Sequence, residues 1–158
     1  MSEPVGRERV LQDASRRGLT VRVVPRPQAS SLHEAAKLLG IRPSDIVKTL
    51  VVKKHDGGFL FALVPGGRKI SWPKLRAVVQ VNKLSMPDAQ IAKEATGYER
   101  GMITPLGSTT AWPVYADESI VGAHVAMGSG EHGYSAFVDG SELLSSFGAV
   151  VADITDPE

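Results

Sequence analysis

Lys48 is the residue whose type and position most directly indicate chemistry. It lies within residues 46–52, an apolar run with the β-branched composition of a buried strand. Because strand side chains alternate between faces, Lys48 shares a face with Ile46 and Leu50. Thr49 points to the other face. A lysine on an apolar face has lost much of its water, faces a pocket that needs a positive charge, or snorkels at a sheet edge, and the spacing alone leaves these alternatives open.

Two glycine-rich segments could supply backbone N–H groups to a substrate. Residues 97–110 are too long for a simple turn, and long ordered loops are often functional. Residues 128–133 match the dinucleotide-binding spacing G-x-G-x-x-G, but the strand pattern of 134–138 follows where a helix should begin, so we reject that function. We expect a hairpin connection there, whose N–H groups either serve the turn alone or face an oxyanion or phosphate.

The remaining side-chain chemistry is sparse. The four histidines have no metal-ligand spacing, so we expect no metal and no cofactor. The absence of cysteine excludes disulfides, thiolate sites and a cysteine nucleophile. A lysine, several hydroxyls and two N–H-rich loops could still accelerate hydrolysis of an activated ester. That reaction mainly needs orientation, donors to the oxyanion and a positioned water.

The elements that must position these residues follow one another irregularly. We expect helices over residues 7–17, 31–39, 71–79, 87–95 and 141–147. We expect strands over residues 19–24, 46–52, 59–64, 114–115, 124–127, 134–138 and 149–154. Hairpins dominate and no regular βαβ period is present. The pattern therefore favours a mixed α/β fold, with a mixed sheet or barrel and flanking helices, over a doubly wound sheet.

Length and charge set the outer limits of the interpretation. The 158 residues predict a single domain over 1–158. Without an apolar stretch of about 18 residues or a signal-peptide core in residues 1–7, we expect no membrane partner and a cytoplasmic location. Residues 1–100 hold all 18 Lys and Arg against 9 Asp and Glu, whereas residues 101–158 hold 8 acidic residues and no basic one. This asymmetry indicates either a basic face for a polyanion or evenly mixed surface charge.

Four segments, in this order, resemble the YbaK/EbsC family: residues 48–52, 96–107, 117–119 and 128–130. This family comprises freestanding relatives of the editing domain inserted in bacterial prolyl-tRNA synthetases. The resemblance covers about residues 20–155. It implies a barrel-like, mixed, largely antiparallel β-sheet flanked by helices. It also implies trans-editing, in which the ester between a wrong amino acid and the 3′ adenosine of a tRNA is hydrolysed.

The resemblance also implies roles for individual residues. Lys48 falls on the family's essential lysine and would bind the 3′-terminal phosphate or ribose. Gly101 falls on the loop glycine whose backbone contacts the substrate, and N–H groups near it would stabilise the oxyanion. The further substrate-binding residues that it implies are Thr49, Met102, Thr104, Pro105, Gly128, Ser129, Gly130 and Ser135.

Departures from the family pattern leave the edited amino acid open. Met102 replaces the second glycine of the family's loop, and Ser135 stands where members specific for cysteinyl-tRNA carry an aspartate. Those members also have aromatic residues where this chain has residues 25–27 and 30–32. Cysteine, alanine, serine and a small non-protein amino acid therefore all remain candidates.

The expected partners are aminoacyl-tRNA, chiefly mischarged prolyl tRNA, and prolyl-tRNA synthetase. The alternatives are a non-catalytic module that binds tRNA or a synthetase, and a small-molecule esterase. Basic residues expected to contact tRNA phosphates are Arg16, Arg17, Arg22, Arg26, Lys53 and Lys54.

Overall fold

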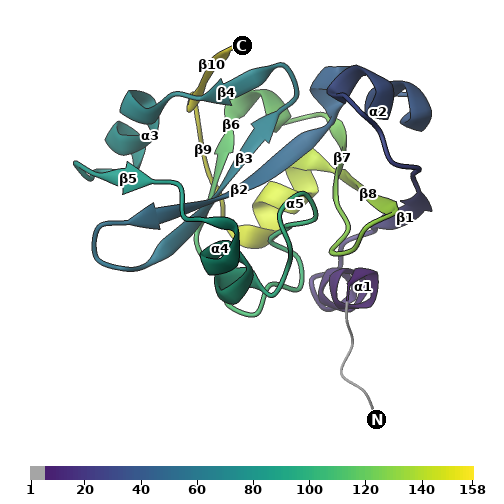
Figure 1. The fold of residues 1–158 in the computed structure, drawn as a ribbon, viewed down its shortest axis with the longest axis horizontal. Helices are drawn as coiled ribbons and strands as arrows, with labels where there is room; N and C mark the ends of the chain where they lie inside the picture. Colours follow the sequence, from purple (N-terminus) through teal and green to yellow (C-terminus); the bar gives the residue numbers. More distant parts are fainter. Residues whose placement is uncertain (1–5) are drawn as a thin grey trace.

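The computed structural model describes residues 6–158 (Figure 1), so the first five residues of the segment inspected for a signal peptide lie outside the described residues. The helices are α1 (Arg7–Arg16), α2 (Leu32–Leu39), α3 (Trp72–Val79), α4 (Ala89–Thr96) and α5 (Gly140–Phe147). The strands are β1 (Arg22–Pro25), β2 (Val47–Lys54), β3 (Phe59–Pro65), β4 (Arg68–Ile70), β5 (Leu84–Ser85), β6 (Val114–Asp117), β7 (His124–Gly128), β8 (Tyr134–Asp139), β9 (Val150–Ala152) and β10 (Thr155–Pro157). None of the described helices is long and apolar enough to cross a membrane.

The strands form three sheets. The largest has the order β5-β2-β3-β6-β9, in which β2 and β3 form the expected antiparallel hairpin and β6 lies parallel to both β3 and β9. A three-stranded antiparallel sheet has the order β1-β8-β7, and β4 pairs with β10. The mixed α/β class is confirmed. The described strands do not close into one barrel, because β7 joins the β2 side of the large sheet only through the bridge between Ile46 and Ala126.

The core has two parts, one on each face of the large sheet. Phe61 and Leu63 of β3 point into the larger cluster, which the three-stranded sheet covers, whereas Leu60 points into a smaller cluster with Leu75 of α3 and Ile154. Because β3 is buried on both faces, its sequence is a continuous apolar run. Strand β2 is therefore held along one edge by a fully buried neighbour, which fixes the position of Lys48.

Most helix ends lie where the sequence predicts them. The hydroxyls of Ser31 and Ser71 accept hydrogen bonds from backbone N–H groups three residues on, as expected for N-caps. The expected cap of α5 is wrong. Asp139, the last residue of β8, keeps extended backbone and caps that helix, whereas the Ser141 hydroxyl accepts the N–H of Gly122 at 2.8 Å.

Candidate functional site

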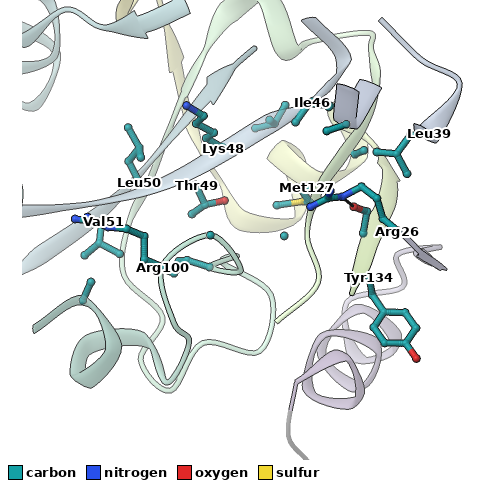
Figure 2. A pocket seen from close by; sticks show the side chains of 18 of the residues that line it. Arg26, Leu39, Ile46, Lys48, Thr49, Leu50, Val51, Arg100, Met127 and Tyr134 are labelled. Carbon is teal, nitrogen blue, oxygen red and sulfur yellow. Dashed lines mark hydrogen bonds between the residues drawn. The ribbon is translucent and has the colours of Figure 1, made fainter. Parts of the chain in front are cut away.

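A cavity of about 480 Å³ lies where β2 and β7 diverge (Figure 2). The two strands meet at Ile46 and Ala126. Beyond that bridge, and within the described residues, β2 has no strand partner on this edge until β5 pairs with Lys53 and Lys54. The free edge of β2 is one wall of the cavity. The loop of residues 97–110 and the start of β8 contribute other walls.

Lys48 and Thr49 both line this cavity although they are consecutive residues. Figure 2 shows Lys48 and Leu50 projecting from one face of β2, and Thr49 from the other. Both can contribute because the cavity follows the edge of the strand rather than one face. The Lys48 side chain is exposed, and within residues 6–158 no carboxylate forms an ion pair with it. An exposed ammonium has not lost its water, so the first of the three alternatives for this lysine does not apply. Lys48 lies at a free sheet edge and borders a pocket.

The Thr49 hydroxyl is a buried polar group in the wall of the cavity. Thr49 is 8% exposed, and its Oγ1 has no hydrogen-bond partner among the described residues. Leaving such a group unsatisfied costs about 1–3 kcal/mol. Its donor and its acceptor capacity are both unused within the described residues.

Gly101 lies near the tip of the 97–110 loop. Its φ of +92° is in the region that favours glycine, and its backbone is exposed at the cavity. The base of the loop is fixed by the Tyr98 hydroxyl, which donates to the carbonyl of Leu106 at 2.8 Å. Burial raises the pKa of Tyr98 to about 12, although the positive charge of Arg9 opposes the rise. The tip is therefore carried by a rigid, buried base.

Helix α1 clamps the same loop from outside the cavity. The Arg9 guanidinium donates to the carbonyl of Gly107 at 2.9 Å and to that of Thr96 at 3.3 Å. The Asp13 carboxylate accepts the Gly107 N–H at 2.9 Å. The N-terminal helix therefore holds the loop that carries Gly101, which sequence reasoning did not detect.

The second glycine-rich segment, residues 128–133, joins β7 to β8 and supports the first loop. This hairpin agrees with our rejection of a dinucleotide site. A Cβ on Gly128 would lie 2.6 Å from the carbonyl oxygen of Ile103 and 2.8 Å from that of Met102. The Gly130 N–H donates to the Met102 carbonyl at 3.1 Å. The two loops can touch only because residue 128 has no side chain.

The structure brings together half of the ten expected site residues. Those that line the cavity are Lys48, Thr49, Gly101, Gly128 and Ser135. Those outside its lining are Met102, Thr104, Pro105, Ser129 and Gly130. These five are buried and form the framework of the loops. The Thr104 hydroxyl accepts the Leu106 N–H at 3.2 Å, for example, and the Ser129 hydroxyl lies 2.9 Å from the Glu131 carbonyl.

Sequence reasoning missed the charge of the cavity. Its lining includes Arg26, Lys48 and Arg100, and contains no Asp or Glu among the described residues. Arg26 follows β1, and its Nε donates to the Ser135 hydroxyl at 3.1 Å. Arg100 directly precedes Gly101. This position in the glycine-rich loop was the one feature of the sequence that could have indicated a positive charge in the cavity. The cavity is an electropositive pocket with largely apolar walls.

The expected basic surface does not form one patch. Arg17 pairs with Asp13 at 3.1 Å and stacks on the Phe147 ring. Lys53 and Lys54 lie at the end of the β2–β3 hairpin, on the opposite side of the molecule from α1 (Figure 1). These cations are separated because α1 and the β2–β3 hairpin, which carry them, lie on different sides of the fold.

Comparison with known proteins places this geometry in a family. The model of the aminoacyl-tRNA editing domain matches residues 26–145. A protein of Enterococcus faecalis named "Putative Cys-tRNA(Pro)/Cys-tRNA(Cys) deacylase EbsC" is 29% identical over 129 residues, which cover 81% of this chain and 79% of that protein. Proline–tRNA ligase of Bacillus licheniformis is 30% identical over 109 residues, or 68% of this chain. The match spans only 19% of the ligase.

A solved structure shares the fold over nearly its whole length. It is described as "a putative trans-editing enzyme for prolyl tRNA synthetase" and has a TM-score of 0.88 at 29% identity, over 98% of this chain and 99% of that one. The family match begins at Arg26 and includes β2, both glycine-rich loops and Ser135. The chain therefore belongs to the aminoacyl-tRNA editing domain family.

Proposed function

We propose that this protein is an aminoacyl-tRNA deacylase that hydrolyses the ester of mischarged tRNA in trans. The observation that carries the proposal is one cavity of about 480 Å³ that Lys48, Thr49 and Gly101 line together; the Thr49 hydroxyl has no partner among the described residues. An aminoacyl ester is already activated, so orientation and oxyanion donors suffice to accelerate its hydrolysis. The family membership and the names of the relatives favour this chemistry.

Lys48 has the properties needed to hold the 3′ end of the tRNA. An exposed, unpaired ammonium beside the cavity can bind a phosphate or the terminal ribose without first losing another partner. This contact would place the ester carbonyl between β2 and the 97–110 loop. The Thr49 hydroxyl would then complete its hydrogen bonding with the aminoacyl group.

Backbone N–H groups near Gly101 would stabilise the transition state. Water, or the side chain of the amino acid itself, adds to the ester carbonyl, and the negative charge that develops on its oxygen accepts hydrogen bonds from the loop. The bond to the ribose oxygen then breaks, and that oxygen takes a proton as the tRNA leaves. With water as the nucleophile, the products are the free amino acid and the uncharged tRNA.

The substrate that we propose to test first is prolyl tRNA carrying Ala, Cys or Ser. The relatives include proline–tRNA ligases, and the structural neighbour is described as acting for prolyl-tRNA synthetase. That synthetase would supply the mischarged tRNA. The expected result is rapid release of at least one of the three amino acids.

Replacement of Lys48 is the direct test of the mechanism. Lys48→Ala should lower the rate about 100-fold, because the charged contact that positions the 3′ end, and with it the ester, is lost. Lys53→Ala, on the same strand but outside the cavity, should lower it far less. If the folded wild-type protein releases no amino acid, the deacylase proposal is wrong and a binding module is the better description. Equal rates for wild type and Lys48→Ala would remove Lys48 from the mechanism.

A further inference from the structure

Arg26 is held firmly at the edge of the cavity. Its backbone N–H donates to the carbonyl of Gly133 at 2.8 Å, which extends the pairing of β1 with β8. Its Nε donates to the Ser135 hydroxyl at 3.1 Å, and Nη1 donates to the carbonyl of Pro27 at 3.0 Å. A guanidinium has five N–H donors, so donors remain for a ligand.

Within residues 6–158, no acidic group compensates this guanidinium. In the part of the chain that the structure describes, Arg26 forms no ion pair. The neighbouring lining is apolar and includes Leu39, Ile46 and Met127. A half-buried cation beside apolar walls is costly unless an anion or a strong acceptor joins it.

Ser135 gives this corner of the cavity a definite polarity. Because its oxygen accepts from Arg26, its own hydrogen is free to point at a ligand. The Arg26–Ser135 pair therefore offers several donors against one remaining hydroxyl lone pair. Such a pair binds oxyanions and other acceptors, and disfavours an ammonium group.

We propose that Arg26 and Ser135 form a second oxyanion-binding subsite, separate from the contact that Lys48 makes with the 3′ end. Figure 2 shows Arg26 and Arg100 on opposite sides of the cavity lining, so the two guanidinium groups would contact different groups of one ligand. The inference rests on the proposed function in assigning that ligand to an aminoacyl-tRNA. The oxyanion comes from one of two sources: a carboxylate on the side chain of the edited amino acid, or a phosphodiester near the 3′ end.

Binding of inorganic phosphate tests the subsite without any catalytic step. Nuclear magnetic resonance should show phosphate shifting the Arg26 Nε–H signal of the wild-type protein. Arg26→Met keeps the apolar stem and removes the charge, and should weaken phosphate binding about tenfold or more. Arg76→Met is the matched control, since Arg76 of α3 is half-buried like Arg26 and lies outside the cavity. Its affinity for phosphate should equal that of wild type.

Deacylation of one tRNA carrying Ala, Ser or Asp then identifies the source of the oxyanion. If the side chain supplies it, Arg26→Met slows release of Asp about tenfold and leaves Ala and Ser unchanged. If a phosphodiester supplies it, all three slow equally and the salt dependence of binding becomes shallower. The inference is overturned if phosphate leaves the Arg26 signal unmoved, or if Arg26→Met binds phosphate as tightly as wild type. A protein that binds phosphate at Arg26 but hydrolyses no aminoacyl-tRNA would refute the proposed function alone.

Discussion

Gly128 shows at the scale of one residue how a missing side chain shapes the cavity. The carbonyls of Met102 and Ile103 occupy the space where a Cβ would lie, at 2.8 and 2.6 Å. Both obstacles are backbone atoms, so they cannot rotate away as a flexible side chain would. Any larger residue at position 128 must move the loop that carries Gly101.

Gly128→Ala should therefore reduce both activity and stability. We expect a loss of about 1–3 kcal/mol in the free energy of unfolding, as for other overpacked sites, and a deacylation rate lower by about tenfold or more. Urea unfolding and the deacylation assay measure these two effects. Gly128 has no left-handed φ, so its cost comes from crowding; Gly57→Ala, at a φ of +93° with open space around it, gives the cost of backbone strain without crowding for comparison. A Gly128→Ala protein with wild-type rate and stability would show that the loop yields freely.

The site residues differ in how far the sequence could predict them. Lys48 was detectable because a cation interrupts an apolar strand. Strand alternation did not indicate that Lys48 and Thr49 line the same cavity, because it places them on opposite faces of β2. One cavity reaches both residues only because the edge of β2 is unpaired there. Arg26 was assigned to a general basic surface. Its pairing with Ser135 depends on the β1–β8 register, over a separation of 109 residues.

At the scale of elements, the 97–110 loop depends on a buried tyrosine. Tyr98 is 2% exposed, and its hydroxyl satisfies the carbonyl of Leu106. Tyr98→Phe would leave that carbonyl buried without a partner, at a cost of about 1–3 kcal/mol. We expect lower stability in urea and faster hydrogen exchange in the loop. Tyr115→Phe is the matched control, because the Tyr115 hydroxyl has no hydrogen bond within the described residues.

Tyr98→Phe should also change how the free energy of unfolding depends on pH above pH 10. Burial raises the pKa of Tyr98 from 10.0 to about 12, so the folded protein holds this proton more tightly than the unfolded chain. The contribution to stability is complete below pH 10 and is lost as the pH rises from 10 to 12. Tyr98→Phe should lack that part of the alkaline loss. Identical alkaline profiles for the two proteins would show that Tyr98 ionises normally.

Strong local signals made most elements predictable. Gly40 and Gly97 end α2 and α4 in left-handed conformation, as their positions in the sequence indicate. Strands β4, β5 and β10 have two or three residues each, too few for a periodic pattern to identify. The clamp of α1 on the loop was also beyond prediction, because it joins segments almost 100 residues apart through Arg9 and Asp13.

At the scale of the whole molecule, Asp117 connects the large sheet to the C-terminal strand. It is 2% exposed at the end of β6 and accepts hydrogen bonds from the Thr155 hydroxyl at 2.8 Å and from the Ile154 N–H at 3.3 Å. Burial alone would raise the pKa of Asp117. Hydrogen bonds from Ser119, Thr155 and Ile154 outweigh that effect and lower it below 3.8.

Asp117→Asn should destabilise the fold by about 1–3 kcal/mol, because one of the two acceptor oxygens becomes a donor that faces other donors. In the wild type, the depressed pKa contributes stability above the ordinary value of 3.8. That contribution is lost as the pH falls through the lower folded-state value. Urea unfolding between neutral pH and pH 3 should show this loss in wild type but not in Asp117→Asn. Asp56→Asn, in an exposed turn, should follow the wild type.

The hydrogen bonds from α1 to the 97–110 loop affect how far this domain can be truncated. The shared family region runs from residue 26 to residue 145, but Arg9 and Asp13 lie before it, and Thr155, the partner of Asp117, lies after it. A fragment trimmed to the homologous region would keep every residue that lines the cavity. It would lose α1, which fixes one wall, and with it strands β1, β9 and β10. For this chain, the segments outside the family match supply the stiffness that the matched segments need.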